Sequence, residues 1–141
     1  MHAMAKPLPV LGRILLGLIF VSAGIGKLGA IATTSASMAK HGIPYPNDLV
    51  WGAVALELGG GLMLMAGLFA RAVALAFFFY ILTLALIFHP YWAMTGAAAR
   101  AQHTAFFERL SMMGGMLFVV AFGAGPYSID TMIGSAAPHP R

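Results

Sequence analysis

Hydrophobic residues gather into four long runs along the chain, separated by polar stretches that contain proline. The runs cover residues 10–30, 49–70, 72–89 and 109–127. None of them alternates strictly as a half-buried strand would, and each comes close to the roughly 20 residues that a helix needs to cross a bilayer. Because a small open sheet would leave backbone groups unpaired in lipid, the pattern predicts an all-α integral membrane four-helix bundle.

The connections between the runs differ in length. The second and third runs meet at Phe69-Ala70-Arg71, a tight turn that predicts an antiparallel helix pair. The other two connections, 31–48 and 89–109, are long and hold prolines and aromatic residues. An up-down-up-down bundle within a single domain, 1–141, places both of them on one side, called here the long-loop side. Long loops are where functional residues tend to lie.

The composition agrees with a membrane protein. Hydrophobic residues make up 60% of the chain and charged residues 9%, and the mean hydropathy is +0.88. Soluble domains carry roughly 25% charged residues, so the lipid bilayer is the expected partner of most of this surface. The net charge of +4 comes from scattered basic residues without a basic stripe, which argues against nucleic acid. The chain has no cysteine, which excludes disulfides, thiol chemistry and iron–sulfur ligation.

The N-terminal run has two interpretations. Lys6, the apolar stretch after it and Ala30-Ile31-Ala32 resemble a cleaved signal peptide, whereas Arg13 and Lys27 inside the run and the three further spans favour a retained helix. Basic residues divide evenly between the two sides of the bundle. If Lys27 and Arg109 point into the bundle, the termini side holds the excess, which predicts that both termini are cytoplasmic.

Ionisable residues within the runs point to one level of the bundle. A charge at mid-membrane costs on the order of 3 kcal/mol, so it needs a partner or a purpose. Glu57 shares a helix face with Gly60 and Gly61, and should therefore point inward. Tracing the four helices brings five ionisable residues together in the long-loop half: Lys27, Glu57, His89, Glu108 and Arg109, the last two opening the fourth helix.

This group admits two interpretations. In the first, Glu57 pairs with Lys27 or Arg109 and the pair only fixes the helix register. In the second, Lys27, Glu57, His89 and Arg109 surround a pocket for a small polar ligand. His89 also has a simpler interpretation, as part of an aromatic belt with the neighbouring Tyr91-Trp92 at the membrane interface.

A second set of charges lies at the opposite end and is interpreted as structural. It consists of Arg13, Arg71 and Asp130, in which Asp130 could pair with either arginine. Gly123 is expected near the end of the fourth helix, and Ser128 or Asp130 could cap a short interfacial helix after it. Arg13 and Lys27 are long enough to extend towards the interfaces.

Small residues favour close helix packing in lipid. The glycines expected at such contacts are Gly26, which pairs with Ser22, together with Gly60, Gly61, Gly114 and Gly115.

The chain carries none of the common catalytic or metal-binding signatures. It has no nucleophile elbow, phosphate-binding loop, dinucleotide fingerprint or zinc-protease motif. Haem b within one chain needs two histidines on facing helices, and only His89 lies on a span. His41, His89 and His103 share the long-loop side without a metal-binding spacing, so no metal site is predicted.

Several stretches resemble the DoxX family, in the same order and over nearly the whole chain. They are GRILLGLIFVSAGIGKL (12–28), HGIP (41–44), LELGGGLMLMAGLFARAVAL (56–75), FH (88–89), GGML (114–117) and GAGPYSID (123–130). The resemblance implies a four-helix protein of the bacterial inner membrane with both termini in the cytoplasm. It also implies a small membrane subunit of a thiosulfate:quinone oxidoreductase or quinol-oxidase type of complex.

One position departs from the family pattern. Members usually carry F-x-K-N before the paired glycines of the fourth helix, and this chain has Phe106-Phe107-Glu108-Arg109 there. Arg109 therefore replaces a neutral amide by a permanent cation. By contrast, five residues match the pattern in place: Lys27, Glu57, Arg71, His89 and Asp130.

Three functions remain open at this stage. The first is a quinone-linked redox subunit, related to sulfur or oxidative stress, that has no intrinsic cofactor, binds a quinone on the long-loop side and receives electrons from another redox subunit. The second is a structural or assembly subunit without a ligand. The third is a small transporter, which the absence of repeats and interrupted helices disfavours. So thin a bundle is expected to associate with a redox subunit or with further copies of itself.

Overall fold

The computed structural model describes residues 7–136, and within that range it is built from helices without strands. Four stretches are long and apolar enough to cross a membrane: Pro7–Leu28, Pro46–Ala66, Ala70–Ala93 and Gly96–Phe122. The all-α membrane fold expected from the hydrophobic pattern is therefore confirmed. Lys6, used in the signal-peptide interpretation, and Arg141 lie outside the described residues.

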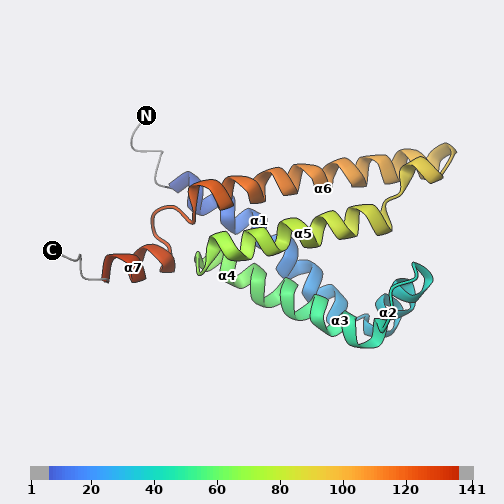
Figure 1. The fold of residues 1–141 in the computed structure, drawn as a ribbon, viewed down its shortest axis with the longest axis horizontal. Helices are drawn as coiled ribbons and strands as arrows, with labels where there is room; N and C mark the ends of the chain where they lie inside the picture. Colours follow the sequence, from blue (N-terminus) through green and yellow to red (C-terminus); the bar gives the residue numbers. More distant parts are fainter. Residues whose placement is uncertain (1–6, 137–141) are drawn as a thin grey trace.

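The helices follow one another in a simple order (Figure 1). The first half holds α1 (Pro7–Leu28), α2 (Ile31–Lys40) and a span made of α3 (Pro46–Ala55), the π-helix η2 (Leu56–Gly60) and α4 (Gly61–Ala66). The second half holds α5 (Ala70–Phe88), the 3-10 turn η3 (Tyr91–Ala93), α6 (Gly96–Phe122) and α7 (Ile129–Ala136). In Figure 1, α7 and the α4–α5 connection lie at one end, and α2 and the start of α6 at the other.

Two long connections expected as loops are largely helical. Residues 31–40 form α2, and α6 begins at Gly96, well before the expected residue 109. The stretch at 97–101 is rich in alanine, the strongest helix former, so the helix continues beyond the apolar run that marked the span. Glu108 and Arg109 consequently lie inside α6 and do not open it.

Two glycines end helices as the backbone requires. Gly67 closes α4 at φ +71° and Gly123 follows α6 at φ +79°, conformations that side chains with a Cβ adopt only with strain. The turn between the second and third spans therefore runs over 67–69, slightly earlier than Phe69-Ala70-Arg71.

The helices pack as two pairs that share one core. α1 lies along α3, η2 and α4, while α5 lies along α6. The rings of Phe20 and Phe77 stack between the pairs with centroids 3.9 Å apart. The buried core around them consists of Phe20, Leu64, Val73, Ala74, Phe77, Ile81 and Met116. Many large apolar side chains outside this core are exposed, as expected for a surface that faces lipid.

Candidate functional site

The second span contains a π-helical turn that carries Glu57. The turn covers Leu56–Gly60 and runs without a break into α4. Such turns insert one extra residue into a helix and are frequent at functional sites. The run Gly59-Gly60-Gly61 supports the turn because glycine has a low preference for the regular α-helix. Glu57 is only 2% exposed, so the turn buries a carboxylate between the helices.

Two neighbours satisfy the Glu57 carboxylate. Lys27 Nζ lies 2.8 Å from both carboxylate oxygens, and the Tyr80 hydroxyl donates to Oε1 at 2.7 Å. This is the one ion pair within 4 Å in residues 7–136. Of the two partners considered for Glu57, the structure therefore selects Lys27. Tyr80 was missed by the sequence reasoning, although a tyrosine in the middle of the uncharged run 72–88 was a signal that a polar partner is near.

A cavity of about 650 Å³ lies on the long-loop side, beside this triad. α1, α2, the loop 41–44, α3, α5 and α6 all contribute to its wall. Most of the lining surface is apolar, and its polar side chains are Lys27, Thr34, Ser37, His41, Tyr80, Thr83, His89 and Arg109. Three of the four residues predicted for a pocket thus line one cavity, and the fourth, Glu57, is bonded to two of the lining residues.

His89 and Arg109 both hold a buried nitrogen without a partner. His89 Nδ1 lies 2.6 Å from Gln102 Oε1, which joins the end of α5 to α6. His89 Nε2 and Arg109 Nε are buried and have no hydrogen-bond partner among the described residues. An unpaired buried polar group costs on the order of 1–3 kcal/mol, so these two atoms are a local cost in the packing between α5 and α6. The simpler interpretation of His89, as part of an aromatic belt, does not account for its place in the cavity wall.

The remaining predicted ionisable residue lies apart. Glu108 is exposed on α6 and forms no ion pair within the described part of the chain. It differs from its neighbour Arg109 because successive helical residues point in different directions. Of the other two histidines considered for a metal, His41 lines the same cavity as His89 and contacts the Phe88 ring. His103 does not line this cavity and packs on Tyr91 and Phe107.

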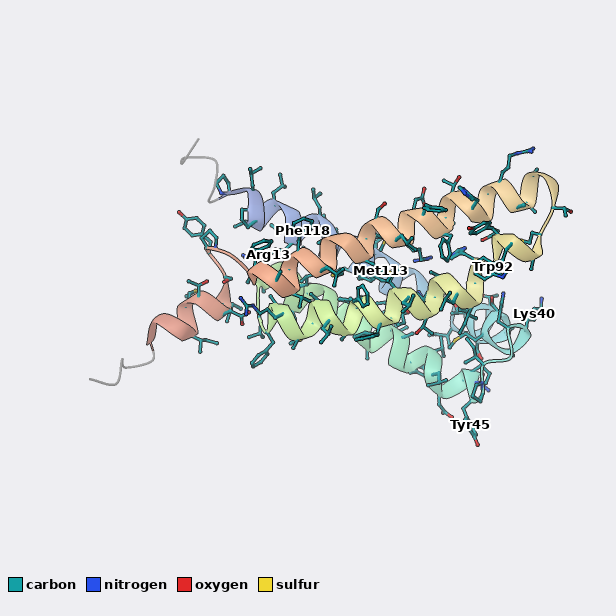
Figure 2. The ribbon with its side chains drawn as sticks, turned by 45° about the horizontal axis from the view of Figure 1, so that its top comes forward. Arg13, Lys40, Tyr45, Trp92, Met113 and Phe118 are labelled. Atoms are coloured by element: carbon teal, nitrogen blue, oxygen red, sulfur yellow. The ribbon has the colours of Figure 1, made fainter. Side chains whose placement is uncertain are left out.

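The charges at the opposite end, where Figure 2 labels Arg13, bind backbone groups and not one another within 4 Å. Arg13 is 4% exposed and does not extend to the interface as expected. Its guanidinium donates to the carbonyl of Met65 at 3.0 Å and to carbonyls of the segment 124–127. Met65 lies in the last turn of α4, where carbonyls lack helical partners, and residues 124–127 form the non-helical segment between α6 and α7. Arg13 therefore ties α1 to α4 and to the segment before α7.

Asp130 acts as a helix cap. Its two oxygens accept hydrogen bonds from Phe69 N at 2.7 Å and Ala70 N at 2.9 Å, at the start of α5. Neither arginine pairs with it within 4 Å in residues 7–136, and Arg71 reaches the Ala121 carbonyl at 3.4 Å. Ser128 Oγ accepts from Thr131 N at 3.2 Å, which caps α7. The two candidate caps thus serve two different helices.

The glycines divide into two groups. An added Cβ would lie 3.0 Å from the Phe77 ring at Gly60, 3.1 Å from the Gly17 carbonyl at Gly61 and 3.1 Å from Leu16 at Gly115. Gly26 and Gly114 have nothing within 4 Å, so the expected close packing at these two is wrong. The face of α1 that meets the second span carries Gly17 and Gly24 instead, because α1 is rotated away from the Ser22–Gly26 side.

The fold and the site define a class of protein: a multi-pass membrane protein with a polar, partly buried site between its helices. The DoxX family model matches residues 8–90, more than half of the chain. Two Escherichia coli K12 relatives are similar over most of their length. Inner membrane protein YphA is 35% identical over 127 residues, 89% of this chain and 91% of YphA. Inner membrane protein YqjF is 33% identical over 125 residues, 88% of this chain and 90% of YqjF.

The chain therefore belongs to the DoxX family, as its motifs suggested. Together with the four apolar helices, these relatives identify it as a multi-pass protein of the bacterial inner membrane. No solved structure matches the chain.

Proposed function

We propose that this protein is a quinone-binding membrane subunit of a redox complex. The observation that carries the proposal is the cavity on the long-loop side, where apolar walls meet Lys27, Tyr80, His89 and Arg109. A volume of about 650 Å³ lies within the range of small-molecule sites.

The residues present fit a quinone. Its flat ring and isoprenoid tail suit the apolar part of the wall, and its ring oxygens suit the polar part. Lys27, Tyr80, His89 and Arg109 all contribute to this polar part. A bound quinone supplies a carrier of electrons and protons that moves within the bilayer.

The chain's own residues hold and exchange protons around that site. Tyr80 lines the cavity and donates to Glu57, so its hydroxyl links the cavity wall to a buried carboxylate. Lys27 contacts both oxygens of this carboxylate. The sequence has no cysteine and no haem-binding histidine pair on its spans. Electrons therefore come from a partner, which we expect to be another redox subunit.

A second function is favoured by one observation. Lys27 and Glu57 satisfy each other's charges without a ligand. A buried ion pair of this kind can have a purely structural role, here to fix the register of α1 against the second span. The protein would then be an assembly subunit without a ligand of its own.

Bound quinone separates the two functions. The full-length protein is purified in a mild detergent, and quinone is extracted with organic solvent and measured by chromatography. We expect the wild type to carry quinone and the double variant His89→Leu/Arg109→Met to lose it. The matched control is His103→Leu/Arg100→Met, which makes the same changes outside the cavity. Thermal unfolding of each variant verifies that it is folded.

Two results contradict the proposal. One is a folded His89→Leu/Arg109→Met variant that keeps its quinone. The other is wild-type protein that holds none, even after incubation with added quinone, which leaves the assembly function. In cells, the same pair of variants should differ in respiration under sulfur or oxidative stress while their protein levels stay equal.

A further inference from the structure

A second pocket lies where α6 extends beyond the end of α5 (Figure 1). His89, directly after α5, contacts Gln102, so residues 96–101 of α6 lie past the end of the third helix. The pocket is open and has a volume of about 500 Å³. Its lining residues are Tyr91, Ala99, Arg100, His103 and Thr104. None of them lines the cavity on the long-loop side, so the two sites are separate.

The polar groups of this pocket suit an anion. The Arg100 guanidinium forms no hydrogen bond or ion pair within residues 7–136. The Tyr91 hydroxyl and the His103 ring can also donate hydrogen bonds. None of the four acidic residues of the chain, which all lie within residues 7–136, lines the pocket. A phosphate has several acceptor oxygens and matches the planar donor fork of an arginine.

The aromatic residues around the pocket mark the level of the lipid headgroups. Tyr91 and Trp92 follow the end of α5, and their ring centroids lie 5.4 Å and 5.7 Å from that of Phe106. Tyrosine and tryptophan concentrate where a membrane meets water. Because Tyr91 is part of the pocket wall, an anion held there lies at the depth of phospholipid phosphates.

The same face of α6 continues from the pocket into the hydrocarbon layer. Phe107 and Gly114 follow Arg100 at i+7 and i+14, with Leu110 between them, so all four lie towards one side of the helix. Phe107 and Leu110 are exposed, and a Cβ added at Gly114 would meet nothing within 4 Å. From Arg100 to Gly114 the helix extends about 21 Å, roughly half the thickness of a bilayer with its headgroups. An acyl chain below the pocket therefore has an open apolar path as long as one leaflet.

From this arrangement we propose that the pocket binds the phosphate of an anionic phospholipid whose acyl chain lies along α6 from Phe107 to Gly114. The inference goes beyond the proposed function and does not depend on it, because the pocket and the quinone cavity share no lining residue. A choline lipid has the same phosphate together with a cation that Arg100 repels, so it binds less well.

The two tryptophans of the chain provide a local test. The Trp92 ring lies 5.3 Å from that of Tyr91, whereas Trp51 lies on α3, and both residues are more than half exposed. The full-length protein is reconstituted into phosphatidylcholine vesicles that contain an increasing share of brominated phosphatidylglycerol or brominated phosphatidylcholine. Bromine on the acyl chains quenches the fluorescence of a tryptophan that it contacts. Trp51→Phe reports from Trp92 alone, and Trp92→Phe reports from Trp51.

The expected result is a preference at one tryptophan only. Brominated phosphatidylglycerol should quench Trp92 with roughly tenfold higher affinity than brominated phosphatidylcholine, the effect of one charge-assisted hydrogen bond. Both lipids should quench Trp51 equally.

Variants in the Trp51→Phe background locate the headgroup. Arg100→Met/His103→Leu should bring the ratio of the two affinities at Trp92 close to one. Arg100→Lys keeps the charge and should keep a smaller preference, because the planar fork is lost. Lys40→Met removes an exposed cation from α2, which Figure 2 labels at the same end of the molecule as Trp92, and should leave the ratio unchanged.

Glycerol phosphate separates a lipid from a soluble phosphate. It has the phosphate without the acyl chains, so at millimolar concentration it should leave the quenching of Trp92 unchanged. Reversal of the quenching would overturn the assignment to a lipid and make the occupant a soluble phosphate.

Three other results would overturn the proposal. They are equal quenching of Trp92 by the two brominated lipids, an equal preference at Trp51, and a preference that survives in Arg100→Met/His103→Leu. Thermal unfolding verifies that each variant is folded. Failure of the lipid site leaves the proposed function intact, because quinone content is measured separately and depends on a different set of lining residues.

Discussion

Replacing Lys27 by methionine should destabilise the protein more than any other single change to the buried triad. Glu57 is 2% exposed and would keep only the neutral Tyr80 hydroxyl as a partner. Stranding a buried charge in this way typically costs about 3–5 kcal/mol of unfolding free energy. Glu57→Gln should cost less, about 1–2 kcal/mol, because the Lys27 side chain is 24% exposed and can turn towards the cavity.

The double variant measures the pairing itself. The double variant leaves no unpaired charge in the core. Lys27→Met/Glu57→Gln should therefore lower the free energy of unfolding by less than the sum of the two single changes, with a difference of about 2 kcal/mol or more. The measurement is reversible unfolding of the detergent-solubilised protein by titration with sodium dodecyl sulfate. Lys40→Met makes the same chemical change at an exposed lysine and should leave the free energy of unfolding nearly unchanged.

Two results would refute this reasoning. Single changes that add within about 0.5 kcal/mol would mean that Lys27 and Glu57 do not act as a pair. Coupling of similar size between Arg109→Met and Glu57→Gln would mean that the carboxylate has a different partner from the one seen here. The structure predicts additivity for that second combination, because Arg109 forms no ion pair with Glu57 within 4 Å.

Three further predictions follow from other parts of the fold. Gly17→Ala would place a Cβ 2.7 Å from the Gly61 carbonyl and should cost about 1–3 kcal/mol of unfolding free energy. Gly59→Ala has nothing within 4 Å and should be neutral or slightly stabilising, because alanine favours a helix more than glycine does. Equal effects of the two changes in chemical unfolding would contradict the close helix contact. Asp130→Asn removes the charge from the cap of α5 and should lower stability by about 0.5–1 kcal/mol, an effect that should shrink at high salt in thermal unfolding. A reporter fused after Arg141 should be cytoplasmic and one inserted at Arg100 should lie outside, and the reverse pattern would invert the predicted orientation.

Most of the helical framework could be predicted from the sequence. Hydropathy is a local property of the chain, so the four spans were recognisable, and the ends Gly67 and Gly123 carry the residues that helix ends need. Helix was underestimated where it leaves the membrane, at α2 and at the start of α6. Those two stretches lie outside the apolar runs, so they were interpreted as loops. Which of their residues are buried depends on the helices packed against them.

The opposite end shows a second limit. A buried arginine within a span was expected to reach for the interface, yet Arg13 binds carbonyls from two segments distant in sequence. Which carbonyls remain free depends on where α4 and α6 end and how they approach α1. The sequence of α1, α4 or α6 taken alone therefore does not reveal the partners of Arg13.

The candidate site combines both kinds of information. The sequence alone predicted that Lys27, Glu57, His89 and Arg109 lie in the same half of the bundle, because the order of the helices and their rise per residue set the approximate level of each side chain. Only the tertiary structure decided that Lys27 pairs with Glu57, that Tyr80 joins them and that Gln102 holds His89. Rotation of each helix about its axis, together with the π-helical turn at Leu56–Gly60, selects which side chains face one another. Rotation is set by packing between helices, which no single stretch of sequence encodes.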